Sequence, residues 1–180
     1  MASGGITHET RIRVRYGEVD RMGVVYHGHY IVYFEMGRTE LLRSLGATYR
    51  EVEEAGTLLF VVETGLKFIA PARYDDVLTV RTRLVSVRGV RLRFEYEVYR
   101  DDVHLTSGFT VLASCDVDGR PRRIPARLAT LMDRGAARQE GQAAPEMPGS
   151  PDGVATVQGG EPPAAGEAAT PSAAPDRGDA

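Results

Sequence analysis

The chain has 180 residues, a formal net charge of −3 and one cysteine, Cys115. A single cysteine excludes an intramolecular disulfide framework and a cysteine metal cluster, and it is typical of a reducing compartment. No apolar run approaches the roughly 20 residues of a membrane-spanning helix, and the N-terminus has no signal-peptide pattern. We therefore expect a soluble, cytoplasmic protein with no membrane span.

The last quarter of the chain differs in composition from the rest. From Gly135 onward there is no aromatic residue, and seven of the ten prolines are found there. Such a segment cannot bury enough apolar surface to offset the entropy lost on ordering. The composition predicts a folded domain at residues 1–134 and a disordered, acidic tail rich in Ala, Pro and Gly at residues 135–180.

The tail also masks the charge of the domain. Its net charge is −5, so the whole-chain value of −3 leaves the domain at +2. A mildly cationic domain suits an anionic small molecule, whereas nucleic-acid binding normally needs a concentrated basic face. We expect no nucleic-acid partner.

The first third of the domain predicts one strand and two helices. Residues 6–16 alternate between apolar and polar, as in a half-exposed strand, and a glycine-bearing loop spans 17–28. From His29 apolar residues recur at three- and four-residue steps, which predicts a long helix that ends near Gly46. A short second helix is expected at about 48–55, because Thr48 and Glu51 have capping-box spacing.

The remainder of the domain is typical of antiparallel strands. Four apolar runs predict strands at about 58–69, 77–87, 91–98 and 105–117, with a tight hairpin at Arg88-Gly89 and a closing helix at about 125–134. On the last strand Cys115 shares a period-two face with Phe109 and Val117, so we expect an inert core thiol. The predicted class is α+β, with a curved antiparallel sheet wrapped around one long central helix.

The loop before the long helix contains the leading candidate for catalysis, Asp20. Backbone N–H groups at a helix N-terminus lack intrahelical partners and the dipole there is positive, so an oxyanion would be stabilised beside this carboxylate. The alternative is an aspartate that turns the loop by binding its own backbone. Glu18 is either a second pocket carboxylate or a solvated loop charge, and we favour the second interpretation.

For the other polar residues near the helix start, we expect roles other than metal binding or acid–base catalysis, except at Glu35. His27 and His29 diverge in direction at a helix start, so we expect no metal site. The main-chain N–H at His27 is a better candidate, as a donor to a carbonyl oxygen. Arg38 and Glu40 fit helix-face ion pairs, while the role of Glu35 stays open. No nucleophile elbow, phosphate loop or dinucleotide fingerprint is present.

The run YGEVDRMGVVYHGHYIVYFEMGR, residues 16–38, resembles the signature of hotdog-fold acyl-CoA thioesterases of the 4-hydroxybenzoyl-CoA thioesterase type, including the bacterial branch associated with the Tol-Pal system. Two further stretches, KFIAPARYDDVLTV and DGRPRRIP, are similar to later parts of that family. The resemblance extends over about Thr10 to Leu131, and the tail has no counterpart.

The resemblance implies roles for individual residues. Asp20 matches the catalytic carboxylate, the N–H of His27 is expected in the oxyanion hole, and Tyr26 belongs to the same catalytic Tyr-His pair. Tyr30 is expected to bind substrate, and Arg88 matches the region of basic groups around the CoA phosphates. The sequence departs from the family pattern at His29, where many relatives have asparagine.

The function implied is hydrolysis of an acyl-CoA or acyl-carrier thioester to the free acid and thiol, with Asp20 as nucleophile or general base. No cofactor is expected, since the CoA thioester is the substrate. Relatives imply a homodimer or homotetramer with the acyl pocket at the protomer boundary. Two rivals are a hotdog 3-hydroxyacyl-thioester dehydratase, using His27 or His29 with Glu35, and a non-catalytic acyl-thioester-binding scaffold.

Overall fold

The computed structural model describes residues 6–126 and 128–133, so the predicted tail at 135–180 lies outside the described residues. A short stretch around residues 128–133 is also helical, close to the predicted closing helix. The named elements are β1 (Ile6–Arg13), the 3-10 helix η1 (Tyr16–Glu18), α1 (His29–Ser44), α2 (Tyr49–Glu54), β2 (Leu58–Phe68), β3 (Val77–Arg88), β4 (Arg91–Arg100) and β5 (Val103–Cys115).

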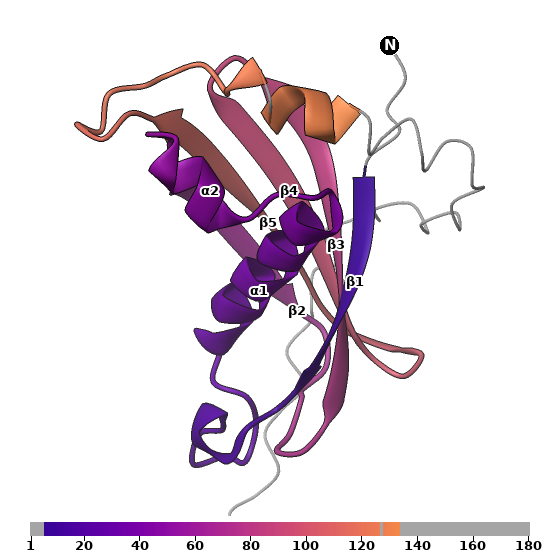
Figure 1. The fold of residues 1–180 in the computed structure, drawn as a ribbon. Helices are drawn as coiled ribbons and strands as arrows, with labels where there is room; N and C mark the ends of the chain where they lie inside the picture. The colour runs from indigo at the N-terminus through magenta and orange to yellow at the C-terminus, as the bar shows by residue number, and fades with distance from the viewer. Residues whose placement is uncertain (1–5, 127, 134–180) are drawn as a thin grey trace, which may run out of the picture. The chain divides into compact units, whose positions relative to one another are not determined.

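The five strands form one sheet in the order β1-β3-β4-β5-β2, and every neighbouring pair is antiparallel. α1 lies across the inner side of the curved sheet (Figure 1), where it packs against β1 and β3. Short hairpins join β3 to β4 and β4 to β5, which is why these strands are antiparallel neighbours. The predicted α+β hotdog architecture is confirmed.

Packing of α1 on the sheet follows from its apolar spacing. Its buried residues include Tyr30, Tyr33, Phe34 and Leu41, which recur at three- and four-residue steps and so share one face. The ring of Phe34 stacks on that of Tyr96 in β4, with centroids 4.2 Å apart and planes 6° from parallel. This contact fixes the middle of the helix over the centre of the sheet.

α2 begins as its capping-box spacing predicts. The Thr48 hydroxyl accepts a hydrogen bond of 3.2 Å from the Glu51 backbone N–H, and the Glu51 carboxylate accepts one of 2.7 Å from the Thr48 N–H. Two N–H groups without intrahelical partners are thereby satisfied at the start of the helix. The prediction of this helix start is confirmed.

The prediction for the faces of β5 is wrong. Gly108 and Thr110 stand opposite Tyr96 and Phe94 of β4, so they share the face that looks toward α1, and Phe109 lies on the other face. Leu105 has no register partner in β4, because an irregularity there adds one residue to β5. Cys115 is buried, as predicted, but it shares the outer face with Phe109, away from α1.

The hairpin between β3 and β4 is displaced by one residue from its predicted position. Arg88 pairs with Arg91, so the two-residue turn is Gly89-Val90 rather than Arg88-Gly89. Gly89 has a φ of +62° and supplies the left-handed conformation that such a turn needs. The glycine correctly indicated a tight turn, but its position within that turn depended on the register of the paired strands.

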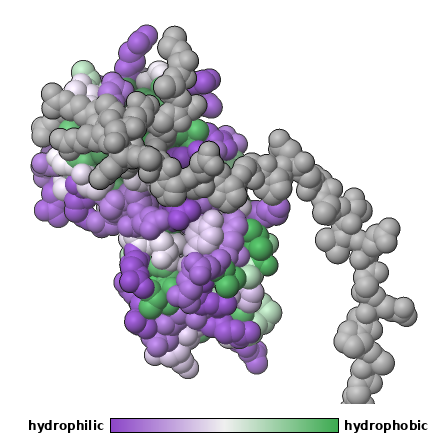
Figure 2. All heavy atoms as spheres, turned by 90° about the vertical axis from the view of Figure 1, so that its right-hand side faces the viewer, coloured by the Kyte–Doolittle hydropathy of each residue, from purple (hydrophilic) through white to green (hydrophobic). Residues whose placement is uncertain are grey.

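Apolar side chains are exposed along β2 and just after it. Phe60, Val61, Val62, Phe68 and Ile69 are each between 44% and 53% exposed. Elsewhere, the face turned to the viewer in Figure 2 is mostly hydrophilic, with apolar residues in separate patches. Within the described residues no helix is both long and apolar enough to cross a membrane.

Gly108 allows α1 to lie close to the sheet, and replacing it with alanine tests this contact. An added Cβ would lie 2.6 Å from the Phe34 ring and 2.6 Å from the Gly65 carbonyl oxygen. We expect Gly108→Ala to lower the free energy of unfolding by about 1–3 kcal/mol, the usual cost of overpacking. Urea unfolding measures this.

Gly17→Ala is the matched control, because a Cβ there meets no atom within 4 Å. Equal unfolding midpoints for Gly108→Ala and wild type would contradict the close approach of Phe34.

Candidate active site

The loop between β1 and α1 is closed by its own backbone. The Tyr26 N–H donates to the Glu18 carbonyl oxygen at 2.9 Å, and the Asp20 N–H donates to the Val24 carbonyl oxygen at 2.9 Å. A tight turn from Asp20 to Gly23 forms its tip, with a further 2.9 Å bond between them. Asp20 is thus held in a folded loop rather than on a free strand end.

The loop is also attached to the segment before β3. The Val25 N–H donates to the Ala72 carbonyl oxygen at 2.8 Å, and both residues are buried. At the other end of this segment, the Val14 N–H donates to the Asp76 carbonyl oxygen at 2.9 Å. These bonds attach the loop to the end of the sheet at which β3 begins.

The two oxygens of the half-buried Asp20 carboxylate have different surroundings. Oδ1 accepts a hydrogen bond of 2.8 Å from the Met22 N–H, an Asx-turn. For Oδ2 the described part of the chain supplies no hydrogen-bond partner. Asp20 therefore does turn the loop, as the simpler interpretation expected, and one of its oxygens has no partner among the described residues.

Glu18 is not the solvated loop charge that we predicted. Its Oε2 accepts hydrogen bonds from the Arg15 N–H at 2.7 Å and from the Tyr33 hydroxyl at 2.8 Å. Tyr33 lies on α1 and is fully buried. The prediction failed because the partner is 15 residues away along the chain, and the packing of α1 decides which hydroxyl reaches the loop.

The Tyr33 phenol stays protonated and acts as the donor. Burial raises its pKa above the ordinary value, and the neighbouring Glu18 carboxylate raises the pKa further, because a phenolate would be repelled there. The two carboxylates of the loop are thus chemically distinct: that of Glu18 is engaged by the core, and that of Asp20 is not.

The first turn of α1 leaves backbone donors free. The N–H of His29 donates to the Tyr26 carbonyl at 2.9 Å, and that of Tyr30 to the His27 carbonyl at 3.3 Å. The N–H groups of His27 and Gly28 have no acceptor among the described residues, and no side chain caps the helix. Two adjacent donors at a positive helix end are suited to an oxyanion.

An aromatic side chain lies over this helix start. Tyr26 is 48% exposed, and its ring centroid is 4.2 Å from that of His27 and 6.2 Å from that of His29. A Cβ at Gly28 would lie 2.9 Å from the Tyr26 ring, so this ring contacts the main chain of the first turn. The Tyr26 ring therefore lies against the main chain at Gly28.

The two predicted substrate-binding residues differ in position. Tyr30 is buried, and its ring centroid is 5.4 Å from that of the half-exposed Phe68. Burial raises the pKa of its phenol, partly offset by a hydrogen bond from the Ala72 backbone. Arg88 is exposed at the far end of β3. Arg88 is roughly 35 Å along the strand from the end that carries the loop.

The helix-face ion pairs are confirmed. Arg38 pairs with Glu35 at 3.1 Å and Glu40 pairs with Arg43, although the Arg38 side chain is buried rather than solvated. Neither His27 nor His29 hydrogen-bonds a carboxylate within the described residues, so no His-Glu35 dyad is assembled there. The same residues contain no group of three or more side chains suited to a metal ion.

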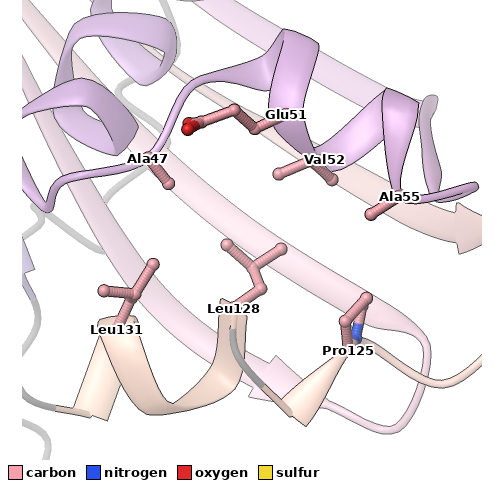
Figure 3. Close-up of a pocket in the computed structure, with 7 residues that line it drawn as sticks. All are labelled: Ala47, Glu51, Val52, Ala55, Pro125, Leu128 and Leu131. Atoms are coloured by element: carbon pink, nitrogen blue, oxygen red, sulfur yellow. The ribbon is translucent and has the colours of Figure 1, made fainter.

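An apolar groove lies away from this loop. Ala47, Val52 and Ala55 face Leu128 and Leu131 across it (Figure 3). It adjoins α2, which follows the C-terminal end of α1, whereas Asp20 precedes the N-terminal end. The 16 residues of α1 separate the two ends by about 24 Å. The groove is therefore not the catalytic site.

The hotdog sheet around one helix agrees with the comparison of the chain with known protein families. The family model of the thioesterase-like superfamily matches residues 14–151. The chain belongs to this superfamily, and the prediction of a thioester-hydrolysing enzyme is confirmed.

Individual relatives agree with this family. The chain is 38% identical over 88 residues to a putative acyl-CoA thioesterase of Bacillus subtilis, a match that covers 49% of this chain and 64% of the relative. It is 36% identical over 107 residues to an acyl-CoA thioesterase of Haemophilus influenzae, covering 59% of this chain and 79% of the relative. A hypothetical protein of Thermus thermophilus has 44% identity and a TM-score of 0.67, with 70% and 97% covered.

The raised pKa of Tyr33 predicts a loss of stability in alkali. Because the folded state keeps this proton above the ordinary phenol value of 10.0, only the unfolded chain releases it as the pH first rises above 10. The stabilising contribution is complete below pH 10 and falls by at most about 1.4 kcal/mol per pH unit above it. Tyr33→Phe should flatten this decline, measured by urea unfolding between pH 9 and 11.5. Parallel declines in wild type and variant would contradict it.

Proposed function

We propose that this protein is an acyl-CoA thioesterase in which Asp20 is the catalytic carboxylate. The observation that carries the proposal is local: Asp20 Oδ2 lacks a partner among the described residues, and the free N–H groups of His27 and Gly28 belong to the same loop and helix start. A base or nucleophile next to an oxyanion site is what acyl transfer to water requires. The acyl-CoA thioesterases among the relatives support the substrate class.

The proposed reaction adds water across the thioester. Either Asp20 removes a proton from a water whose oxygen attacks the carbonyl carbon, or its own oxygen attacks and water then cleaves the resulting anhydride. The carbonyl oxygen becomes an oxyanion that accepts hydrogen bonds from the N–H groups of His27 and Gly28. When the intermediate collapses, the C–S bond breaks and CoA leaves as a thiolate, which takes up the proton. No cofactor enters this scheme.

The proposed oxyanion hole uses main chain, so it is independent of the His27 side chain. In well-studied enzymes one such donor lowers the barrier by about 2.7–4 kcal/mol. The N–H of Tyr26 does not contribute, because it is bonded within the loop. The proposed role of Tyr26 is to shield the first turn from water with its ring, and that of Tyr30 is to support the substrate through Phe68.

Removing the charge of Asp20 tests the catalytic assignment. Asp20→Asn keeps an oxygen that can accept from the Met22 N–H, so the loop should stay folded. We expect turnover of a good acyl-CoA substrate to fall by about 10²–10⁴-fold, the range for a lost general base. Release of CoA thiol, followed with a thiol reagent across short, long and aromatic acyl-CoAs, measures it.

Asp102→Asn is a matched control, because Asp102 is exposed in the turn between β4 and β5. An undiminished rate in Asp20→Asn would sink the assignment of Asp20, whereas acyl-CoA binding without turnover in wild type would favour a non-catalytic thioester-binding protein.

We further propose a homodimer or homotetramer that pairs along β2. This strand is one edge of the sheet, and an edge offers unpaired N–H and C=O groups. Val61 shares the inner face with Leu112, yet it is 44% exposed. α1 packs mainly on β1 and β3, which lie at the opposite edge of the sheet from β2. A second copy would cover the exposed apolar strand and complete an acyl pocket beside Phe68. In such an assembly, Arg88 of one protomer could bind the CoA phosphates of a substrate held by another protomer.

A charge at the edge strand should disrupt this assembly. We expect wild type to sediment as a dimer or tetramer and Val61→Asp to shift toward monomer with at least about tenfold lower turnover, because a buried unpaired carboxylate is costly. Val103→Asp, at a residue that is 48% exposed on β5, is the control and should leave both unchanged. An active wild-type monomer in sedimentation velocity would refute the proposed pairing.

Three further proposals concern the subfamily, the cellular location and the carrier of the acyl group. We assign the chain to the 4-hydroxybenzoyl-CoA thioesterase type and its Tol-Pal-associated branch, on the motif at residues 16–38. A cytoplasmic location is supported by the single, buried cysteine. An acyl-carrier thioester remains the alternative substrate, and the same panel with acyl-carrier proteins separates the two.

A further inference from the structure

We propose that Tyr33 and Glu18 form a positioning pair that holds the Asp20 loop against the start of α1. The inference rests on the proposed catalytic role of Asp20 and adds two residues that do not touch the reacting atoms. Its basis is the 2.8 Å hydrogen bond from the buried Tyr33 hydroxyl to Glu18 Oε2.

Glu18 ties the loop at three points. Its carboxylate binds Tyr33 on the second turn of α1 and the Arg15 N–H, where the chain leaves β1. Its carbonyl oxygen accepts from the Tyr26 N–H, where the chain enters α1. One residue thus joins the beginning of the loop, its end and the helix, and Asp20 follows it by two residues.

The partners of Glu18 are suited to a fixed position. Tyr33 has no exposed surface, and its ring packs on Tyr30 with centroids 5.8 Å apart, so its hydroxyl has little freedom to move. A hydrogen bond to an ionised carboxylate is shorter and stronger than a neutral one. Because Tyr33 belongs to the same helix whose first N–H groups are free, this bond sets the loop relative to the oxyanion site.

The distance between Asp20 and the free N–H groups then depends on Glu18. A misplacement of about 1 Å in a catalytic group can cost about 10²-fold in rate. The Asp20 turn itself is closed by Met22 and Val24, so it should survive the loss of Tyr33 as a unit and shift as a whole. The loss should therefore appear in kcat rather than in substrate binding.

Tyr33→Phe removes only the hydroxyl and is the primary test. We expect kcat for acyl-CoA hydrolysis to fall about 10–100-fold with KM within about twofold of wild type. Tyr96→Phe is the matched control, since it deletes a buried hydroxyl that bonds Thr110 at 2.8 Å on the sheet, away from the loop. It should lower the melting temperature to a similar extent and leave kcat unchanged.

Substitutions at Glu18 separate positioning from general stability. Glu18→Ala should lower kcat at least as much as Tyr33→Phe, because it breaks the bond to Tyr33 and also the bond to the Arg15 N–H. The double variant should be no worse than Glu18→Ala alone, because the Tyr33 bond is already lost there. Glu18→Gln keeps an acceptor oxygen and should restore most of the rate. In an Asp20→Asn background Tyr33→Phe should have no further effect on the residual rate.

The outcomes distinguish this inference from the proposed function. A fully active Tyr33→Phe beside an inactive Asp20→Asn overturns the positioning pair and leaves the catalytic assignment intact. An equal loss in Tyr96→Phe, or an undiminished effect of Tyr33→Phe in the Asp20→Asn background, also overturns it. If Asp20→Asn retains full activity, the proposed function fails first.

Discussion

The packing of α1 against the sheet is the constraint on which the rest of the structure depends. Phe34 stacks on Tyr96, and Gly108 leaves the space that this ring needs. Once the middle of the helix is fixed, its N-terminal end is fixed too, and so are the N–H groups of His27 and Gly28. A short main-chain donor pair cannot be aimed by its own side chains, so the core has to aim it.

The loop before α1 also holds a carboxylate that the core does not engage. Glu18 and Asp20 lie two residues apart, and their surroundings differ. Glu18 is bound by the Arg15 N–H and the Tyr33 hydroxyl, so its charge is used in holding the loop. One oxygen of Asp20 accepts a hydrogen bond within its own turn, and the other has no partner among the described residues. Division of labour between neighbouring carboxylates is a familiar basis for acid–base chemistry.

The single chain leaves apolar surface at one edge of its sheet. The other edge strand, β1, has polar residues such as His8 and Glu9, whereas β2 exposes Phe60 and Val61. Edge strands with exposed apolar side chains tend to pair with another chain. α1 packs mainly on β1 and β3, and on the β2 side only its Tyr30 ring reaches Phe68 among the aromatic contacts of the described residues.

The sequence by itself predicted the elements and a candidate site. Period-two and helical spacing, capping at Thr48 and glycines at turns are local signals, so the strands, helices and their order were predictable, and the motif at residues 16–38 selected Asp20. Only the tertiary structure decided what depends on partners distant in the chain. It turned Thr110 rather than Phe109 toward α1, because one extra residue at Leu105 reverses the faces of β5. It also paired the Glu18 carboxylate with the Tyr33 hydroxyl, because helix packing and not sequence spacing decides a hydrogen bond between residues 15 positions apart.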